Sequence, residues 1–181
     1  DMDEQLYFAY GSNINLDQMS VRCPAATPVC PVVLDNYRLA FRGSFNFNGV
    51  ATIIPAQGEK VYGLLWRITP ACEVALDRYE GYPRLYGKEQ VIVQDGNGQR
   101  YPVMVYIMAR EFCLDPAEPS QGYFSGIVQG CKQNGIPVRP LFEAAQRTRI
   151  EAEQTERPPW LQMRFDNIKK PRHKKKNGPA R

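Results

Sequence analysis

Histidine is almost absent from this chain of 181 residues, and the single histidine, His173, lies close to the C-terminus. A Ser-His-Asp or Cys-His catalytic apparatus needs an imidazole beside its nucleophile, and most catalytic zinc sites use histidine ligands. We therefore expect neither kind of site in the body of the protein. A general acid or base there must be a carboxylate, or a Lys, Cys or Tyr side chain with a perturbed pKa.

Cysteine pairs, an export signal and long apolar runs are also missing. The five cysteines are odd in number and include no Cys-x-x-Cys pair, which disfavours a disulfide framework and a structural metal site. The first five residues are acidic, unlike the basic start of a signal peptide. The longest apolar run, residues 101–109, is about half as long as a membrane-spanning helix. We expect a cytoplasmic protein without membrane contact and without a bound metal.

Basic charge is concentrated at the C-terminus. Seven Lys and Arg residues and no acid lie within residues 169–181, so residues 1–168 carry a net charge of −3 although the whole chain carries +4. The length predicts one domain over residues 1–155, followed by an extension over residues 156–181 whose basic tail we expect to be disordered. So short a basic run without interleaved aromatic residues is typical of a solvated segment, so we do not expect nucleic-acid binding.

Turn and capping signals predict a chain of strands interrupted by four helices. Thr69 and Pro70 form a helix start and Gly81 a helix stop, while the DGNG sequence at residues 95–98 predicts a β-hairpin. The expected helices cover residues 16–22, 70–80, 121–133 and 139–154. The expected strands cover residues 5–10, 28–34, 37–41, 50–54, 60–68, 89–94 and 99–109.

Two local features suggest chemistry. Glu80 lies in the last turn of the helix that ends at Gly81, where the helix macrodipole disfavours an anion and is expected to raise the pKa of the carboxyl. The turn at residues 10–13 contains Gly11, which permits close backbone approach, and its N–H groups can bind a carboxylate or an oxyanion. Taken singly, Glu80 also fits a solvated surface residue, the turn an ordinary strand end and Tyr123 a packing residue.

Several short motifs, taken together in their order and spacing, resemble the γ-glutamylcyclotransferase family. They are YFAYGSN at residues 7–13, VYGLLW at 61–66, LDRYEGY at 76–82, PSQGY at 119–123 and NGIP at 134–137. The similarity covers about residues 5–142. It implies an α+β fold of the γ-glutamylcyclotransferase-like or AIG2-like type, a small mixed β-barrel with flanking helices and one cavity for a γ-glutamyl group.

The resemblance also implies roles for individual residues. Carried over by position, Glu80 is expected to be the catalytic carboxylate and Tyr123 a further contact to the substrate. The substrate-binding loop is expected to consist of Tyr7, Phe8, Ala9, Tyr10, Gly11 and Ser12. No metal and no cofactor is implied.

The implied reaction is a cyclisation of the lyase or acyltransferase type, in the context of glutathione metabolism. The α-amine of a γ-glutamyl amino acid or amide attacks its own side-chain carbonyl, which yields 5-oxoproline and a free amine, with Glu80 as general acid and base. Branches specific for glutathione or γ-glutamyl-lysine carry Leu where this chain has Asn13 or Thr where it has Ser12. The chain therefore resembles the general branch more closely.

Several alternatives stay open from the sequence. The same chemistry could remove a γ-glutamyl protecting group from one biosynthetic intermediate, or the barrel could be a non-catalytic module that binds a polyanion through its basic tail. The leaving amine is not identified, and the loop could bind either the substrate α-carboxylate or the oxyanion. A homodimer is compatible with the sequence and is not required by it.

Overall fold

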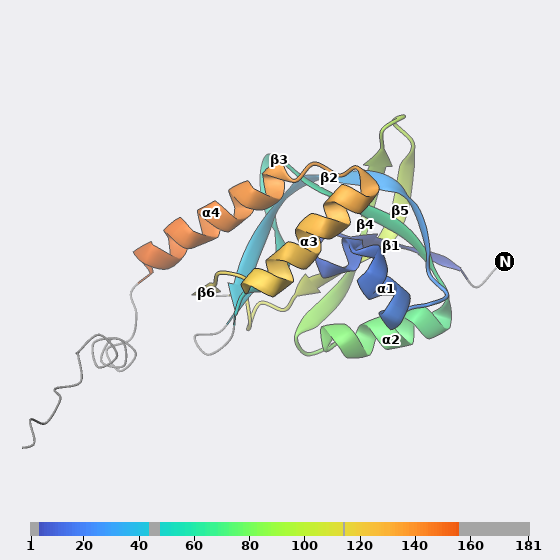
Figure 1. Ribbon diagram of the computed structural model, residues 1–181, viewed down its shortest axis with the longest axis horizontal. Helices are drawn as coiled ribbons and strands as arrows, with labels where there is room; N and C mark the ends of the chain where they lie inside the picture. The colour runs from blue at the N-terminus through green and yellow to red at the C-terminus, as the bar shows by residue number, and fades with distance from the viewer. Residues whose placement is uncertain (1–3, 44–47, 114, 156–181) are drawn as a thin grey trace, which may run out of the picture.

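A computed structural model describes residues 4–43, 48–113 and 115–155, which form a mixed β-barrel with flanking helices (Figure 1). The strands are β1 (Gln5–Ala9), β2 (Thr27–Gly43), β3 (Val50–Ile68), β4 (Tyr86–Asp95), β5 (Arg100–Met108) and the short β6 (Asp115–Pro116). Five of them follow the order β3-β1-β5-β4-β2, and pairing of β2 with β3 closes the barrel. The β1–β5 pair is parallel and the others are antiparallel. The fold expected from the sequence is thereby confirmed.

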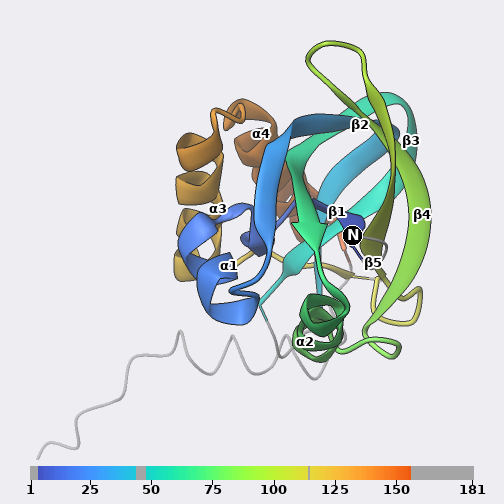
Figure 2. The ribbon, with the colours of Figure 1, turned by 90° about the vertical axis from the view of Figure 1, so that its right-hand side faces the viewer.

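Within the described residues, four α-helices and one short 3-10 turn accompany the barrel. They are η1 (Ser12–Ile14), α1 (Leu16–Arg22), α2 (Pro70–Glu80), α3 (Gln121–Asn134) and α4 (Arg139–Gln154). Figures 1 and 2 show α3 and α4 side by side along one flank of the barrel, while α1 and α2 lie next to each other at its lower edge. All four helices lie within one residue of the predicted bounds.

Two long strands replace the four short ones that the sequence predicted between residues 28 and 68. In β2, Asn36 adopts φ 63° and interrupts the pairing between Asp35 and Tyr37. In β3, the partners of these two residues are Lys60 and Pro55, so residues 56–59 bulge out between paired segments. The turn-forming residues here therefore form β-bulges and do not end the strands, because β2 and β3 remain paired on both sides of each bulge.

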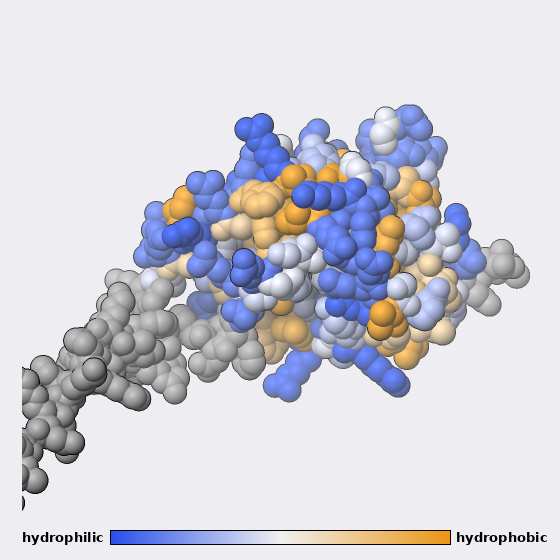
Figure 3. Space-filling view, viewed as in Figure 1, coloured by the Kyte–Doolittle hydropathy of each residue, from blue (hydrophilic) through white to orange (hydrophobic). Residues whose placement is uncertain are grey.

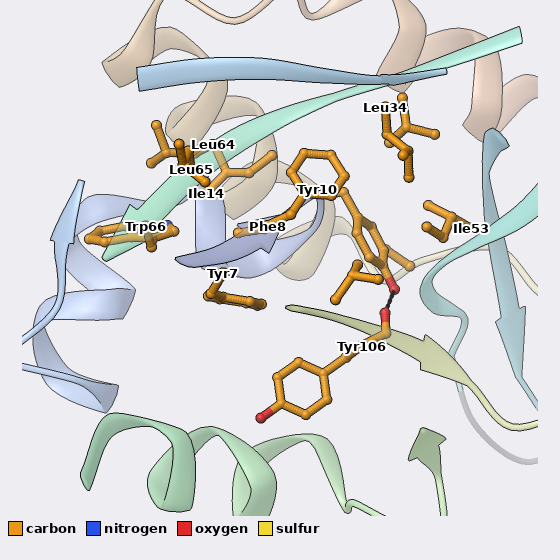
Figure 4. Packing of buried hydrophobic residues seen from close by; sticks show 14 of the residues in the cluster. Tyr7, Phe8, Tyr10, Ile14, Leu34, Ile53, Leu64, Leu65, Trp66 and Tyr106 are labelled. Atoms are coloured by element: carbon orange, nitrogen blue, oxygen red, sulfur yellow. Dashed lines mark hydrogen bonds between the residues drawn. The ribbon is translucent and has the colours of Figure 1, made fainter. Parts of the chain in front are cut away.

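The core fills the barrel around β1 and β3 (Figure 4). Phe8, Leu65 and Ile68 are completely buried, and Leu76 of α2 is buried with them. Burial of such apolar side chains is worth about 1.5–3 kcal/mol each relative to exposure. The packing of Leu76 therefore anchors α2 to the barrel.

Helix α2 is also fixed by its caps and by charged contacts. The Thr69 hydroxyl accepts a hydrogen bond from the Cys72 N–H at 3.2 Å, and Gly81 ends the helix with φ 66°. The Lys88 ammonium lies 2.8 Å from Asp77, whose carboxylate also accepts a hydrogen bond of 2.5 Å from the Tyr106 hydroxyl. Because Lys88 is on β4 and Tyr106 on β5, these contacts determine where the last turn of α2 lies.

Helix α3 approaches the chain just after η1 very closely. A Cβ atom at Gly130 would lie 2.6 Å from the Asn15 nitrogen, so a larger residue does not fit there. The Asn15 side chain caps α1 through the Gln18 N–H at 3.0 Å and donates a hydrogen bond of 2.9 Å to the Gly126 carbonyl. This contact holds α3 against the end of β1.

The outer surface mixes polar and apolar residues. Phe142 and Ile150 of α4 are about half exposed, and Figure 3 shows small apolar areas on the face that carries α3 and α4. All five cysteines are free thiols. Within residues 4–43, 48–113 and 115–155, no helix is long and apolar enough to cross a membrane. The predicted extension over residues 156–181 lies outside the described residues.

Gly63 offers a direct test of the barrel packing. A Cβ atom there would overlap the Ala9 carbonyl oxygen and the Phe8 ring. Both belong to paired strand or core and cannot retreat, so we expect Gly63→Ala to lower the free energy of unfolding by at least about 2 kcal/mol. The control is Gly87→Ala in β4, where the nearest atom would be the Ile107 oxygen at 3.9 Å. Equal urea midpoints for the two variants would contradict this packing.

Candidate active site

A pocket of about 200 Å³ opens where the end of β1, the end of α2 and the start of α3 meet. This volume suits a ligand smaller than a typical drug molecule, for which pockets of roughly 300–1,000 Å³ are usual. Among the described residues that line it, Glu80 is the only acid. The lining comprises Tyr7, Tyr10, Gly11, Ser12, Asn13, Val50, Ala51, Tyr79, Glu80, Leu85, Tyr86, Tyr106 and Tyr123.

The tyrosine hydroxyls in this lining have different hydrogen-bond partners. The Tyr10 hydroxyl donates to the Tyr106 carbonyl at 2.5 Å (Figure 4), and the Tyr86 hydroxyl donates to the Ala51 carbonyl at 2.6 Å. The Tyr123 hydroxyl instead accepts a hydrogen bond of 3.0 Å from the Ala51 N–H. Because an accepting hydroxyl keeps its proton available, Tyr123 can donate a hydrogen bond to a ligand in the pocket.

Each polar group of Asn13, apart from its backbone N–H, makes at least one hydrogen bond to a neighbouring residue. Its backbone carbonyl accepts a hydrogen bond of 3.0 Å from the Trp66 indole N–H. Its side-chain oxygen accepts one of 2.6 Å from Arg22. Its side-chain nitrogen lies 3.0 Å from the Tyr7 hydroxyl and 3.4 Å from Glu80 Oε1, and donates to both. The carboxyl group of Glu80 is therefore held by an amide donor at the end of β1.

Burial raises the pKa of Glu80 from 4.5 to about 7, and the positive charge of Arg22 acts in the opposite direction. The sequence predicted a raised pKa from the helix macrodipole, whereas burial is the main cause in the structure. Burial also raises the pKa values of Tyr7, Tyr10 and Tyr123 well above their usual range. At neutral pH the pocket thus combines neutral phenols with one carboxyl group that is ready to gain or lose a proton.

The turn after β1, which lines the same pocket as Glu80, leaves two backbone N–H groups without a partner inside the turn. In η1 the Ile14 N–H bonds to the Gly11 carbonyl at 3.0 Å, so the N–H groups of Ser12 and Asn13 precede the first bond of the turn and have no partner within it. A Cβ atom at Gly11 would lie 3.1 Å from the Ala51 Cβ and 3.5 Å from the Tyr123 hydroxyl. Glycine at this position keeps the pocket wall open.

Most of the residues that the sequence singled out meet at this pocket. Glu80, Tyr123 and the loop residues Tyr7, Tyr10, Gly11 and Ser12 all line it. Phe8 and Ala9 do not line it and are fully buried in the core. Alternation of side chains along β1 explains why Phe8 points away from the pocket that Tyr7 faces.

Other pocket residues were not among the predicted site residues, namely Asn13, Val50, Ala51, Tyr79, Leu85, Tyr86 and Tyr106. Tyr79 could have been found as the neighbour of Glu80. No local signal marks Tyr86 and Tyr106, because barrel closure brings β4 and β5 to the pocket. Among the described residues, no group of three or more His, Cys, Asp or Glu side chains is arranged to hold a metal ion.

Comparisons with known proteins agree with this architecture. The family model "Gamma-glutamyl cyclotransferase, AIG2-like" matches residues 7–125. The chain is 31% identical to the gamma-glutamylcyclotransferase of Homo sapiens over 145 residues, 76% of each chain. It is 32% identical to that of Mus musculus over 140 residues, 73% of this chain and 72% of the relative. A solved gamma-glutamyl cyclotransferase superposes with a TM-score of 0.68 at 26% identity, covering 91% of this chain and 99% of that one.

The raised pKa of Glu80 predicts an unusual pH dependence of stability. A carboxyl group whose pKa is higher in the folded than in the unfolded protein makes the folded state bind more protons, so stability falls as pH rises from 4.5 to about 7. We expect Glu80→Gln to raise the free energy of unfolding at about pH 8 by up to about 3 kcal/mol. Urea unfolding should show almost no gain at about pH 4. A Glu80→Gln protein less stable than wild type at about pH 8 would contradict the burial of this charge.

Proposed function

The chain belongs to the gamma-glutamyl cyclotransferase, AIG2-like family, and we propose that its tyrosine-lined pocket cyclises γ-glutamyl amino acids or amides. The products are 5-oxoproline and a free amine. The observation that carries the proposal is the Glu80 carboxyl group, which lines a small pocket and has a pKa of about 7. A group that transfers protons in both directions works best when its pKa is close to the working pH.

The proposed reaction needs two proton transfers, and both are assigned to Glu80. Its carboxylate takes a proton from the α-amine as that nitrogen attacks the side-chain carbonyl carbon and closes the five-membered ring. The bond to the leaving nitrogen then breaks, and the same carboxyl group returns the proton to the departing amine. No water, oxidant or second substrate enters this balance.

Holding the glutamyl chain in a curled shape lowers the activation barrier in addition to the proton transfer. A well-oriented intramolecular attack reaches effective molarities of about 10⁵ M or more, which corresponds to roughly 7 kcal/mol of barrier. The aromatic walls and the Tyr123 hydroxyl support a role in holding the chain in this shape. The N–H groups of Ser12 and Asn13 suit the α-carboxylate or the developing oxyanion, for which one lost donor typically costs about 10²-fold in rate.

The alternatives predict different substrates or ligands. Removal of a γ-glutamyl protecting group in one pathway uses the same pocket and differs in the amine that leaves, so a panel of γ-glutamyl dipeptides and γ-glutamyl amines separates the two. A binding module that acts through residues 169–181 relies on a segment outside the described residues. It also gives no reason for a carboxyl group in the pocket lining at Glu80. The enzyme is therefore the better supported function.

Glu80→Gln tests the assignment because the amide has nearly the same shape but cannot transfer a proton. We expect the release of 5-oxoproline, measured by mass spectrometry, to fall by about 10²–10⁴-fold, the usual contribution of a general acid and base. Calorimetric binding of a γ-glutamyl compound should stay within a few-fold of wild type. The exposed Glu89→Gln in β4 is the matched control and should retain wild-type turnover. Full turnover by Glu80→Gln would refute the role of Glu80.

A further inference from the structure

Arg22 does not line the pocket, yet it contacts residues that do. This last residue of α1 places one guanidinium nitrogen 2.6 Å from the Asn13 side-chain oxygen and 3.1 Å from the Ser12 hydroxyl. Its guanidinium carbon lies 3.7 Å from the centre of the Tyr79 ring. Arg22 thus joins the turn after β1 to the last turn of α2, the helix that ends with Glu80.

The contact with Arg22 determines which way the Asn13 amide faces. A guanidinium group only donates hydrogen bonds, so the amide oxygen of Asn13 must face Arg22 and the amide nitrogen must face the other way. That nitrogen then donates to the Tyr7 hydroxyl and to Glu80 Oε1. Rotating the amide by half a turn would place N–H groups against the guanidinium group and an oxygen against the carboxylate, and both contacts would be repulsive.

We propose that Arg22 is a positioning residue of this site, which fixes the Asn13 amide with its N–H groups toward Glu80 and thereby holds the carboxylate in the orientation needed for proton transfer. The proposal rests on the cyclisation proposed above. It assigns Arg22 no contact with the substrate, because the side chain lies behind Ser12 and Asn13 and not in the pocket lining.

The charge of Arg22 gives the same arrangement a second effect. Among the described groups around Glu80, Arg22 is the cation that lowers the pKa of the carboxyl group, against the larger effect of burial. The other described residues with titratable groups that face the pocket are tyrosines, from β1 and the turn after it (Tyr7, Tyr10), α2 (Tyr79), β4 (Tyr86), β5 (Tyr106) and α3 (Tyr123). Loss of Arg22 is therefore expected to leave less of Glu80 ionised at neutral pH.

Two substitutions at Arg22 separate positioning from simple stabilisation. In Arg22→Met both the hydrogen bonds and the charge are lost. We expect kcat for 5-oxoproline release to fall by about 10²-fold, as is typical when a reacting group is misplaced, with little change in KM. The midpoint of the kcat/KM against pH profile should move to higher pH. Arg22→Lys keeps the charge but cannot stack a planar group on Tyr79, so it should restore the midpoint and only part of kcat.

Arg38→Met is the matched control. Arg38 is also half-buried and lies 3.6 Å from Glu151, away from the pocket, so its loss should leave kcat and the pH midpoint at their wild-type values. The proposal is overturned if Arg22→Met keeps the wild-type kcat and midpoint. It is also overturned if Arg22→Met and Arg22→Lys lose kcat equally without any shift of the midpoint, since that result indicates a purely structural role.

A double-mutant cycle tests the coupling without any assay of activity. Urea midpoints at about pH 8 are compared for wild type, Arg22→Met, Glu80→Gln and the double variant. Arg22→Met should lower the midpoint more in wild type than in the Glu80→Gln background, because the attraction between the two charges exists only in the former. Equal losses in the two backgrounds overturn the proposal.

The activity measurements and the double-mutant cycle together distinguish a failure of this proposal from a failure of the proposed function. If wild type releases no 5-oxoproline from any γ-glutamyl compound, the cyclisation is refuted, and the cycle still decides whether Arg22 acts on Glu80. If Arg22→Met does not fold, Arg22→Gln takes its place in the activity measurements because it also removes the charge. A reduced kcat with the midpoint moved to higher pH then supports the proposal, and a wild-type midpoint overturns it.

Discussion

Burial of the Glu80 carboxyl group depends on where α2 ends. The helix starts at the Thr69 cap and stops at Gly81, so its length leaves Glu80 in the last turn. Leu76 packs into the core, and Asp77 is held by Lys88 of β4 and Tyr106 of β5. These contacts fix the helix so that Glu80, its last residue, faces the pocket. The free energy needed to dehydrate the carboxyl group therefore comes from packing and ion pairing elsewhere on the same helix.

The rest of the pocket is assembled by close backbone approaches that only glycine permits. Gly63 lets β3 approach the end of β1, and Gly130 lets α3 approach the chain after η1. Asn13 and Asn15 then satisfy the polar groups that these approaches bury. As a result, the turn after β1 has one set of contacts to the barrel, another to α3 and a third to α2, and the pocket lies where the three meet.

The parts of this arrangement that depend only on residues adjacent in the sequence could be predicted from the sequence. Caps, helix stops and the hairpin at residues 95–98 follow from local chemistry, so α2 and the place of Glu80 at its end were predicted correctly. The continuity of β2 and β3 could not be predicted, because it depends on pairing between distant segments. Arg22 was missed for a similar reason, since an arginine at a helix end normally indicates only a favourable dipole contact.

The proposed roles of the site residues depend on one physical property, a carboxyl group that changes its protonation state near neutral pH. The most direct test is an NMR titration of the side-chain carboxyl carbon of Glu80, with Glu80→Gln used to assign the signal. The structure predicts a pKa of about 7 for this group. A measured pKa near the ordinary value of 4.5 would mean that Glu80 is hydrated like a surface residue, and the proposed proton transfer would have no basis.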